Sequence, residues 1–208
     1  DYPIDFGWDK EPSPLFDFLA RKSVLFEIKS AAQLTSADLE KSNALVVISP
    51  MSLTAEQQEM IRNYQAAGGG ICVVGAGAER ADFGVRGSLP EISADLLVNA
   101  QVQTQVLTKL KSLVPEGPWI ELGGAEHVLA NLTSIGGGRE VVLHLLNYAP
   151  KPAAGVRLTL SLGTKLAALA GKEPMLISPD AKSAPLDNVR WKGATLEATV
   201  PLLPVYSA

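Results

Sequence analysis

The stretch that decides the fold of the first half covers residues 44–74 and reads ALVVISPMSLTAEQQEMIRNYQAAGGGICVV. Its first five residues are all apolar, which is typical of a strand in a parallel sheet that is covered on both faces. Thr54 and Gln57 then stand at the spacing of a capping box, whose side chains satisfy backbone groups at the start of a helix. We expect this helix to end at Gly68, because glycine readily adopts the left-handed conformation that closes a helix. A second apolar strand follows at 71–74, so the stretch predicts a strand–helix–strand unit.

The alternation of helices and strands extends in both directions from this unit. Upstream, Ser13 and Pro14 favour the start of a helix, Val24 to Ile28 is rich in strand-forming residues, and Thr35 favours the start of a second helix. Downstream, apolar residues at helical spacing predict a helix that Pro115 ends: Val106, Leu107, Leu110, Leu113 and Val114. Residues 1–115 are therefore expected to form a small doubly wound α/β domain with a parallel sheet.

After Pro115 the pattern changes to the two-residue alternation of half-buried strands. Apolar and polar residues alternate along 156–162, 188–192 and 195–200. Gly136, Gly137 and Gly138 separate two further strand-like segments, which predicts a hairpin. Several short strands separated by turns are typical of an antiparallel β-sandwich, which we expect over residues 116–208.

Composition excludes some classes of partner and leaves the compartment open. The net charge of −4 argues against a nucleic-acid partner. The longest apolar runs are far shorter than the about 20 residues that cross a bilayer, so no membrane partner is expected. Cys72 is the only cysteine, which excludes an intrachain disulfide. That fits a reducing compartment and equally a periplasmic or secreted protein stabilised by its core, and our interpretation leans to the latter.

Cys72 lies in a glycine-rich stretch that suggests two kinds of chemistry. A nucleophilic cysteine of the amidotransferase type needs an exposed turn between a strand and a helix, with a histidine nearby. Cys72 instead lies inside an apolar strand, so we expect a core thiol. The sequence Gly75-Ala76-Gly77 begins like a dinucleotide-binding loop, but Arg80 takes the place of its third glycine. We therefore predict no catalytic residue and no cofactor.

The two histidines, His127 and His144, do not stand at the spacing of metal ligands, so no metal site is expected. Val141 to Leu146 is apolar on both faces apart from His144. This pattern predicts a central strand, with the His144 imidazole hydrogen-bonded in the core.

If the first half binds a small molecule, its site is expected at the carboxyl ends of the parallel strands, where open α/β sheets hold their ligands. The candidate residues follow the strands 44–48 and 71–74. They are Ser49, Pro50, Met51, Gly75, Ala76, Gly77 and Glu79. Sugar stacking on Trp119 or Trp191 in the second half is a further alternative.

Two stretches resemble parts of glycoside hydrolases. The strand 44–50, the helix after Thr54 and the glycines 68–70 are similar to the amidotransferase-like, or flavodoxin-like, α/β domain of β-galactosidases, called the trimerisation domain. The segment VVLHLLNY at 141–148, with residues 177–180 and 200–206, is similar to the β-sandwich that ends many of these enzymes.

The catalytic carboxylates of such enzymes lie on a preceding barrel of about 250 residues, for which this chain has no room. The resemblance therefore implies a non-catalytic accessory region of a larger carbohydrate-active protein. Its partner would be the catalytic domain of the same polypeptide, or a second copy in a homo-oligomer. The alternative is a small-molecule or carbohydrate-binding module, or a hydrolase.

Overall fold

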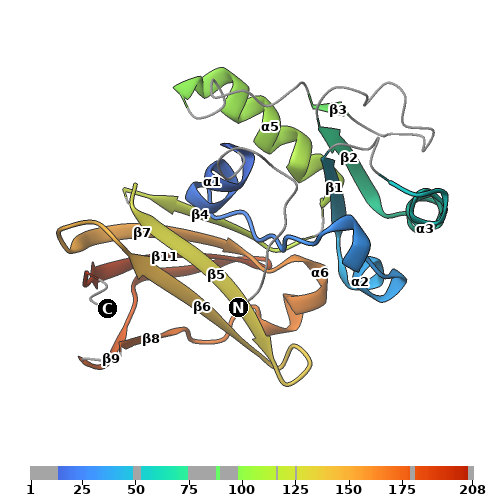
Figure 1. The fold of residues 1–208 in the computed structure, drawn as a ribbon. Helices are drawn as coiled ribbons and strands as arrows, with labels where there is room; N and C mark the ends of the chain where they lie inside the picture. Colours follow the sequence, from blue (N-terminus) through green and yellow to red (C-terminus); the bar gives the residue numbers. More distant parts are fainter. Residues whose placement is uncertain are drawn as a thin grey trace. The chain divides into compact units, whose positions relative to one another are not determined.

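The structure is a computed structural model that describes residues 14–48, 53–74, 88–89, 98–115, 117–124, 126–178 and 181–205 (Figure 1). The chain divides into two compact units. Unit 1 consists of Asp1–Asp17 and Glu27–Pro115, and unit 2 consists of Phe18–Phe26 and Glu116–Ala208. The division falls within helix α1 (Pro14–Arg21), whose apolar residues Leu15, Phe18 and Leu19 are buried.

Unit 1 contains a small parallel sheet with the strand order β1-β2-β3 among its described residues. In chain order the elements after α1 are η1 (Ala31–Gln33), α2 (Ser36–Lys41), β1 (Ala44–Ile48), α3 (Ala55–Ala66), β2 (Gly70–Val74), β3 (Ser88–Leu89) and α5 (Ala100–Leu113). Ala44 pairs with Gly70 and Ile48 with Val74, so β1 and β2 are in register along their whole length. The predicted strand–helix–strand unit at 44–74 is therefore confirmed.

Side-chain caps fix where the helices of unit 1 begin. The Thr54 hydroxyl accepts a hydrogen bond from the Gln57 N–H at 3.3 Å, and the Gln57 side chain accepts one from the Thr54 N–H at 2.8 Å. This is the predicted capping box. Thr35 and Asp38 form a second capping box at the start of α2. Such caps satisfy backbone donors that a helix leaves unpaired at its first turn, so α2 and α3 each have a defined start.

Asp38 makes the start of α2 sensitive to acid. Hydrogen bonds from Lys29 and Thr35 lower the pKa of Asp38 from 3.8 to about 2. A carboxyl group whose pKa is lower in the folded chain stabilises the fold above its unfolded pKa, and this contribution disappears as the pH falls through the folded value. We expect the stability of unit 1 to fall between pH 4 and pH 2, in part through Asp38. In Asp38→Asn, urea unfolding followed by circular dichroism should show a smaller decrease over this interval, and an unchanged decrease would contradict the assignment.

The core of unit 1 forms where α3 packs on the sheet. Val47, Ile61, Ile71 and Val73 make one buried cluster. Burying each such side chain contributes about 1.5–3 kcal/mol. The helix ends at Gly68, whose φ of +97° is the left-handed conformation that the sequence predicted.

Unit 2 contains a four-stranded antiparallel sheet and two hairpins among its described residues. The strands are β4 (Trp119–Gly123), β5 (Val128–Ile135), β6 (Glu140–Asn147), β7 (Ala153–Ser161), β8 (Met175–Ser178), β9 (Ala181–Pro185), β10 (Asp187–Lys192) and β11 (Thr195–Leu203), with α6 (Gly163–Leu166) and η4 (Ala167–Leu169) after β7. The sheet has the order β10-β11-β7-β4, and the hairpins are β5-β6 and β8-β9. The hairpin predicted around Gly136–Gly138 is confirmed, because β5 and β6 pair on either side of these glycines.

One face of the four-stranded sheet carries the main core of unit 2. Alternate residues of β7 and β11 are buried there, as the two-residue pattern predicted: Leu158, Leu160, Leu196 and Ala198. Leu132 and Leu143 of the β5-β6 hairpin pack against this cluster. One face of the hairpin is therefore turned to the core.

Two local predictions are wrong. Val24 to Ile28 forms no strand, and Phe26 and Ile28 keep 42% and 44% of their surface exposed. Strand propensity alone is weak without a neighbouring strand and a buried face to support it. His144 is exposed rather than in the core, because only one face of β6 is turned to the core. Val141 and Leu143 lie on that face, and His144 lies on the opposite one. In the described part of the chain β6 pairs with β5 alone, so the prediction of a central strand is wrong as well.

The coarse fold prediction is confirmed: the chain combines helices and a small parallel sheet with antiparallel sheets. Among the described residues, no helix has the length and apolar character needed to cross a membrane.

Candidate functional site

The predicted ligand-binding residues lie outside the residues that the structure describes. They are Ser49, Pro50, Met51, Gly75, Ala76, Gly77 and Glu79. The strands that precede them, β1 and β2, are parallel and in register. The carboxyl ends of both strands therefore lie at one edge of the sheet.

Cys72 lies in the middle of β2, paired with Val46 of β1, and none of its surface is exposed. The prediction of a core thiol is therefore confirmed. A nucleophile must reach its substrate, and a buried thiol is inert. Nothing in this position resembles the exposed turn that amidotransferase chemistry requires.

We expect the Cys72 thiol to stay unlabelled by an aromatic disulfide reagent while the chain is folded, and to react fully in denaturant. The physical reason is its zero exposure. As a control, Ala67→Cys in a Cys72→Ala background places a thiol at an exposed position, where it should react rapidly. Rapid labelling of native Cys72, measured by absorbance, would contradict its burial.

The two histidines lie near the surface of unit 2. His144 is on β6, and the His127 ring contacts the Tyr148 ring edge-on, with 5.7 Å between ring centres. In the described part of the chain, no group of three or more His, Cys, Asp or Glu side chains could hold a metal ion.

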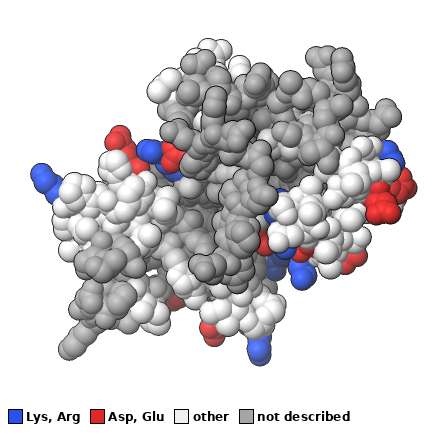
Figure 2. Space-filling view, in the orientation of Figure 1, with Lys and Arg blue, Asp and Glu red and all other residues white. Residues whose placement is uncertain are grey.

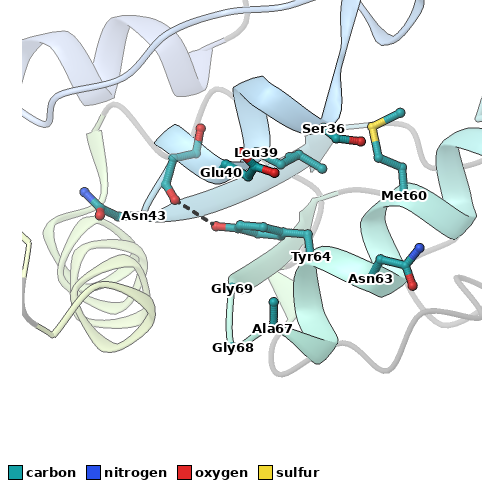
Figure 3. A pocket seen from close by; sticks show the side chains of 11 residues that line it. Ser36, Leu39, Glu40, Asn43, Met60, Asn63, Tyr64, Ala67, Gly68 and Gly69 are labelled. Atoms are coloured by element: carbon teal, nitrogen blue, oxygen red, sulfur yellow. Dashed lines mark hydrogen bonds between the residues drawn. The ribbon is translucent and has the colours of Figure 1, made fainter.

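A cavity of about 460 Å³ opens between α2 and α3 in unit 1 (Figure 3). Its walls come from α2, from the connection between α2 and β1, from α3, and from the glycines between α3 and β2. Because these connections precede parallel strands, the cavity lies at the amino ends of β1 and β2. This is the edge opposite the one where the sequence predicted ligand binding.

Tyr64 is the aromatic residue of this cavity. Figure 3 shows its ring between Gly69 on one side and Leu39 and Glu40 of α2 on the other. A Cβ atom at Gly69 would collide with the ring, so the ring lies flat against the Gly69 backbone. The Tyr64 hydroxyl donates a hydrogen bond to the Ser42 carbonyl oxygen at 3.3 Å, which joins α3 to the end of α2. These two contacts fix the plane of the ring.

Burial raises the pKa of the Tyr64 phenol above its ordinary value of 10.0. The hydroxyl therefore keeps its proton at neutral pH and remains a hydrogen-bond donor. A second contact steadies the other end of α3, because the Gln57 side chain donates to the Ala31 carbonyl oxygen at 2.8 Å. The α3 wall of the cavity is thus held at both ends.

The remaining lining is polar with little charge. Asn43 and Asn63 provide side-chain amides, Ser36 provides a hydroxyl and Glu40 a carboxylate, while Met60 adds apolar surface. No lysine or arginine lines the described walls. Figure 2 shows charged atoms gathered at the right edge of the view, where Figure 1 places α3. The charged residues Glu56, Glu59 and Arg62 of α3 are not part of the cavity.

Sequence reasoning missed this cavity. It placed Tyr64 with Met60 and Ile61 on a buried helical stripe, whereas Ile61 is buried and the other two are only half-buried. The sequence feature that could have indicated the cavity is the pair of helix caps at 35–38 and 54–57, followed by Tyr64 and the glycines 68–69.

Comparison of the chain with models of known protein families found no match, and neither did searches of curated proteins and of solved structures.

Proposed function

We propose that this chain is a non-catalytic accessory or assembly region of a larger, glycoside hydrolase-like protein, with a doubly wound α/β domain followed by a β-sandwich. Its work is to pack against the catalytic domain of the same polypeptide or against a second copy. The sequence resemblance of 44–74 and of 141–148 to such regions motivates the proposal. The observation that carries it is a group of exposed large apolar side chains on one face of unit 2: Ile135, Val142, Leu146 and Tyr148.

This outer face of the β5-β6 hairpin is built from cross-strand pairs. Leu129 pairs with Leu146, and Thr133 with Val142. Val142 and Leu146 keep 37% and 36% of their surface exposed. Ile135 at the end of β5 and Tyr148 after β6 are exposed as well. Asn131 and His144 form the pair between these two on the same face, and Glu140 stands opposite Ile135, so polar side chains separate the exposed apolar ones. Exposed apolar side chains that share one face and are bordered by polar groups can mark a surface that contacts another protein.

The burial of Cys72 also supports an accessory role over amidotransferase chemistry, because a sealed thiol leaves that fold without its nucleophile. The first test is enzymatic. Purified chain should hydrolyse no member of a panel of aryl glycosides at a rate above the blank. Turnover that persists through repurification would overturn the proposal.

The second test concerns assembly. Val142→Asp places a charge in the outer face, and Val189→Asp is its matched control, since Val189 is an equally exposed valine of β10 at 38%. If the partner is a second copy, sedimentation velocity should show self-association that Val142→Asp weakens and Val189→Asp leaves unchanged. If the partner is the catalytic domain, the same pattern should appear when that domain is added. Equal effects of the two variants would contradict a role for this face.

A binding module is the second candidate, and the cavity between α2 and α3 is the observation that favours it. Its volume falls in the range of about 300–1,000 Å³ that is usual for small-molecule sites.

A further inference from the structure

The β5-β6 hairpin leaves one edge of β6 without a neighbouring strand. β5 pairs with the other edge along its whole length, from Ile135 opposite Glu140 to Val128 opposite Asn147. In the described part of the chain no further strand pairs with β6, and no other element runs alongside it (Figure 1). An edge of this kind presents unpaired backbone groups, which are a template for a further strand.

The hydrogen bonds of the hairpin show which residues present their backbone to this edge. The Tyr148 N–H donates to the His127 carbonyl oxygen at 3.1 Å, which continues the pairing of β5 with β6 by one residue. In an antiparallel pair such bonded positions recur at every second residue. The even-numbered residues of β6 therefore bond to β5, and Val141, Leu143 and Leu145 direct their N–H and carbonyl groups to the open edge.

The edge strands of the four-stranded sheet have features that discourage pairing with another strand. β10 has a bulge between Asp187 and Arg190, and Asn188 has a positive φ of 53°. β4 is only five residues long. β6 is eight residues long, keeps an unbroken register with β5, and contains no proline, glycine or lysine. Short strands, bulges, lysines and prolines are the usual protection of an edge, so β6 is the less protected strand.

The composition of β6 also distinguishes it from β5, whose outer edge has no partner strand among the described residues either. The second half of β5 is polar at Asn131, Thr133 and Ser134. In β6, His144 alone interrupts the apolar run from Val141 to Leu146. Valine favours strand pairing and asparagine disfavours it, so β6 is the better site for another strand.

The charge pattern of β6 fits a second β6 strand that runs in the opposite direction. Glu140 is the one charged residue of β6 and stands at its first position. Two antiparallel β6 strands hold their Glu140 carboxylates at opposite ends, whereas two parallel strands would hold them side by side. Like charges at neighbouring positions of a sheet are destabilising. Pairing of the same strand from each copy also forms a closed two-fold dimer, which is the commonest kind of oligomer.

We propose that a second copy of this chain docks at the open edge of β6, with the two β6 strands antiparallel about a two-fold axis at Leu143. Val141 then lies opposite the partner's Leu145, and Val142 lies opposite the partner's His144. Core-facing side chains thereby meet core-facing side chains, as the pleat of a sheet requires. This inference rests on the proposed assembly role and names both the partner and the strand that binds it.

Residue-resolved amide exchange tests the pairing. In dilute samples the N–H groups of Val141, Leu143 and Leu145 should exchange rapidly, because nothing accepts their hydrogen bonds at the open edge. They should become protected at concentrations where sedimentation velocity shows a dimer. The N–H groups of Val142 and His144, which bond to β5, should be protected at every concentration.

The two ways in which this experiment can fail have different meanings. A dimer that leaves the Val141, Leu143 and Leu145 amides unprotected would overturn the edge pairing, while the assembly role would stand. A chain that stays monomeric at the concentration of a nuclear magnetic resonance sample would overturn the second copy as partner. The assembly role would then depend on the catalytic domain alone.

Disulfide cross-linking tests the register. Val142→Cys and His144→Cys replace exposed side chains, and the buried Cys72 can stay in place. Directly opposite residues of two antiparallel strands have Cα atoms about 4.5–5.5 Å apart, a separation that a disulfide can span. A mixture of the two variants should therefore form a disulfide-linked dimer under mild oxidation faster than either variant alone.

Val189→Cys is the control for random collisions, because Val189 is an equally exposed valine of β10. It should form linked dimers more slowly than the mixture. Both β6 substitutions lie on the face turned away from the core, so the amide spectra of the variants should show a folded chain. Equal rates in the mixture and in the separate variants, or no linked dimer in the mixture, would overturn the proposed register.

Discussion

Gly70→Ala is expected to destabilise unit 1 by about 1–3 kcal/mol or more, the usual cost of overpacking a core. A Cβ atom at Gly70 would lie 2.7 Å from the backbone carbonyl oxygen of Leu113 and 3.1 Å from its Cβ atom. Leu113 is the last residue of α5, so the added methyl group must push the end of this helix away from β2. Hydrogen exchange of the β1 and β2 amides measures the loss.

Alanine substitutions at two neighbouring glycines distinguish backbone strain from steric collision as the cause of this loss of stability. At Gly68 the φ is +97° and no atom lies within 4 Å of an added Cβ, so Gly68→Ala introduces backbone strain alone, worth about 1–2 kcal/mol. At Gly69 the collision is with the Tyr64 side chain, so Tyr64→Leu should partly rescue Gly69→Ala. Leu113→Ala should not rescue Gly70→Ala, because the obstacle is a backbone atom. Rescue in that pair would show that the close approach to the Leu113 carbonyl is not the cause.

Asn147→Asp should be the most damaging conservative substitution in unit 2. The Asn147 side chain is 2% exposed. Its amide nitrogen donates to the carbonyl oxygens of Lys151 at 3.0 Å and Leu203 at 3.2 Å, and its oxygen accepts from the Ala149 N–H at 3.0 Å. An aspartate would direct an anionic oxygen at two carbonyl groups that had a donor. Each buried group left unpaired costs about 1–3 kcal/mol, so we expect a total loss of roughly 3 kcal/mol or more.

The loss of stability in Asn147→Asp should also depend on pH, in a direction that can be predicted. Two facing carbonyl groups disfavour the charged carboxylate, so its pKa in the folded chain should rise above the unfolded value. The deficit of Asn147→Asp relative to the native chain should therefore shrink as the pH falls, since a protonated carboxyl can donate one of the lost bonds. Asn131→Asp, at an exposed position of β5, is the control and should change little. Urea unfolding followed by tryptophan fluorescence, to which Trp119 and Trp191 of unit 2 contribute, measures both variants. Equal stability of the two would refute the role of Asn147.

Sequence reasoning succeeded where the determining interactions are local. The Thr54–Gln57 capping box depends on residues three positions apart, and both of its hydrogen bonds are present. The alternation along β7 and β11 likewise identified the buried residues Leu158 and Leu196. In such segments the spacing of the residues carries most of the structural information.

Predictions from the sequence failed where the structure depends on contacts between residues far apart in the chain. His144 stands among apolar neighbours, yet whether a strand is central depends on how many strands pair with it, which its own sequence does not encode. Val24 to Ile28 had suitable residues, but no strand in the described part of the chain pairs with this segment. The cavity was missed because it depends on how α2 and α3 face one another, and the bond from Tyr64 to Ser42 spans residues far apart in the chain.

The division of unit 2 into two chain segments has a consequence for how the protein is made. Leu25, in the first segment, packs against a cluster that includes Leu196 and Ala198 of β11. Synthesis proceeds from the amino terminus, and early domains can fold while later residues are still being added. Unit 1 can therefore complete its sheet on the ribosome, while Leu25 must wait for nearly the last strand to emerge. Until then, this short segment stays without the sheet face on which it packs in the finished fold.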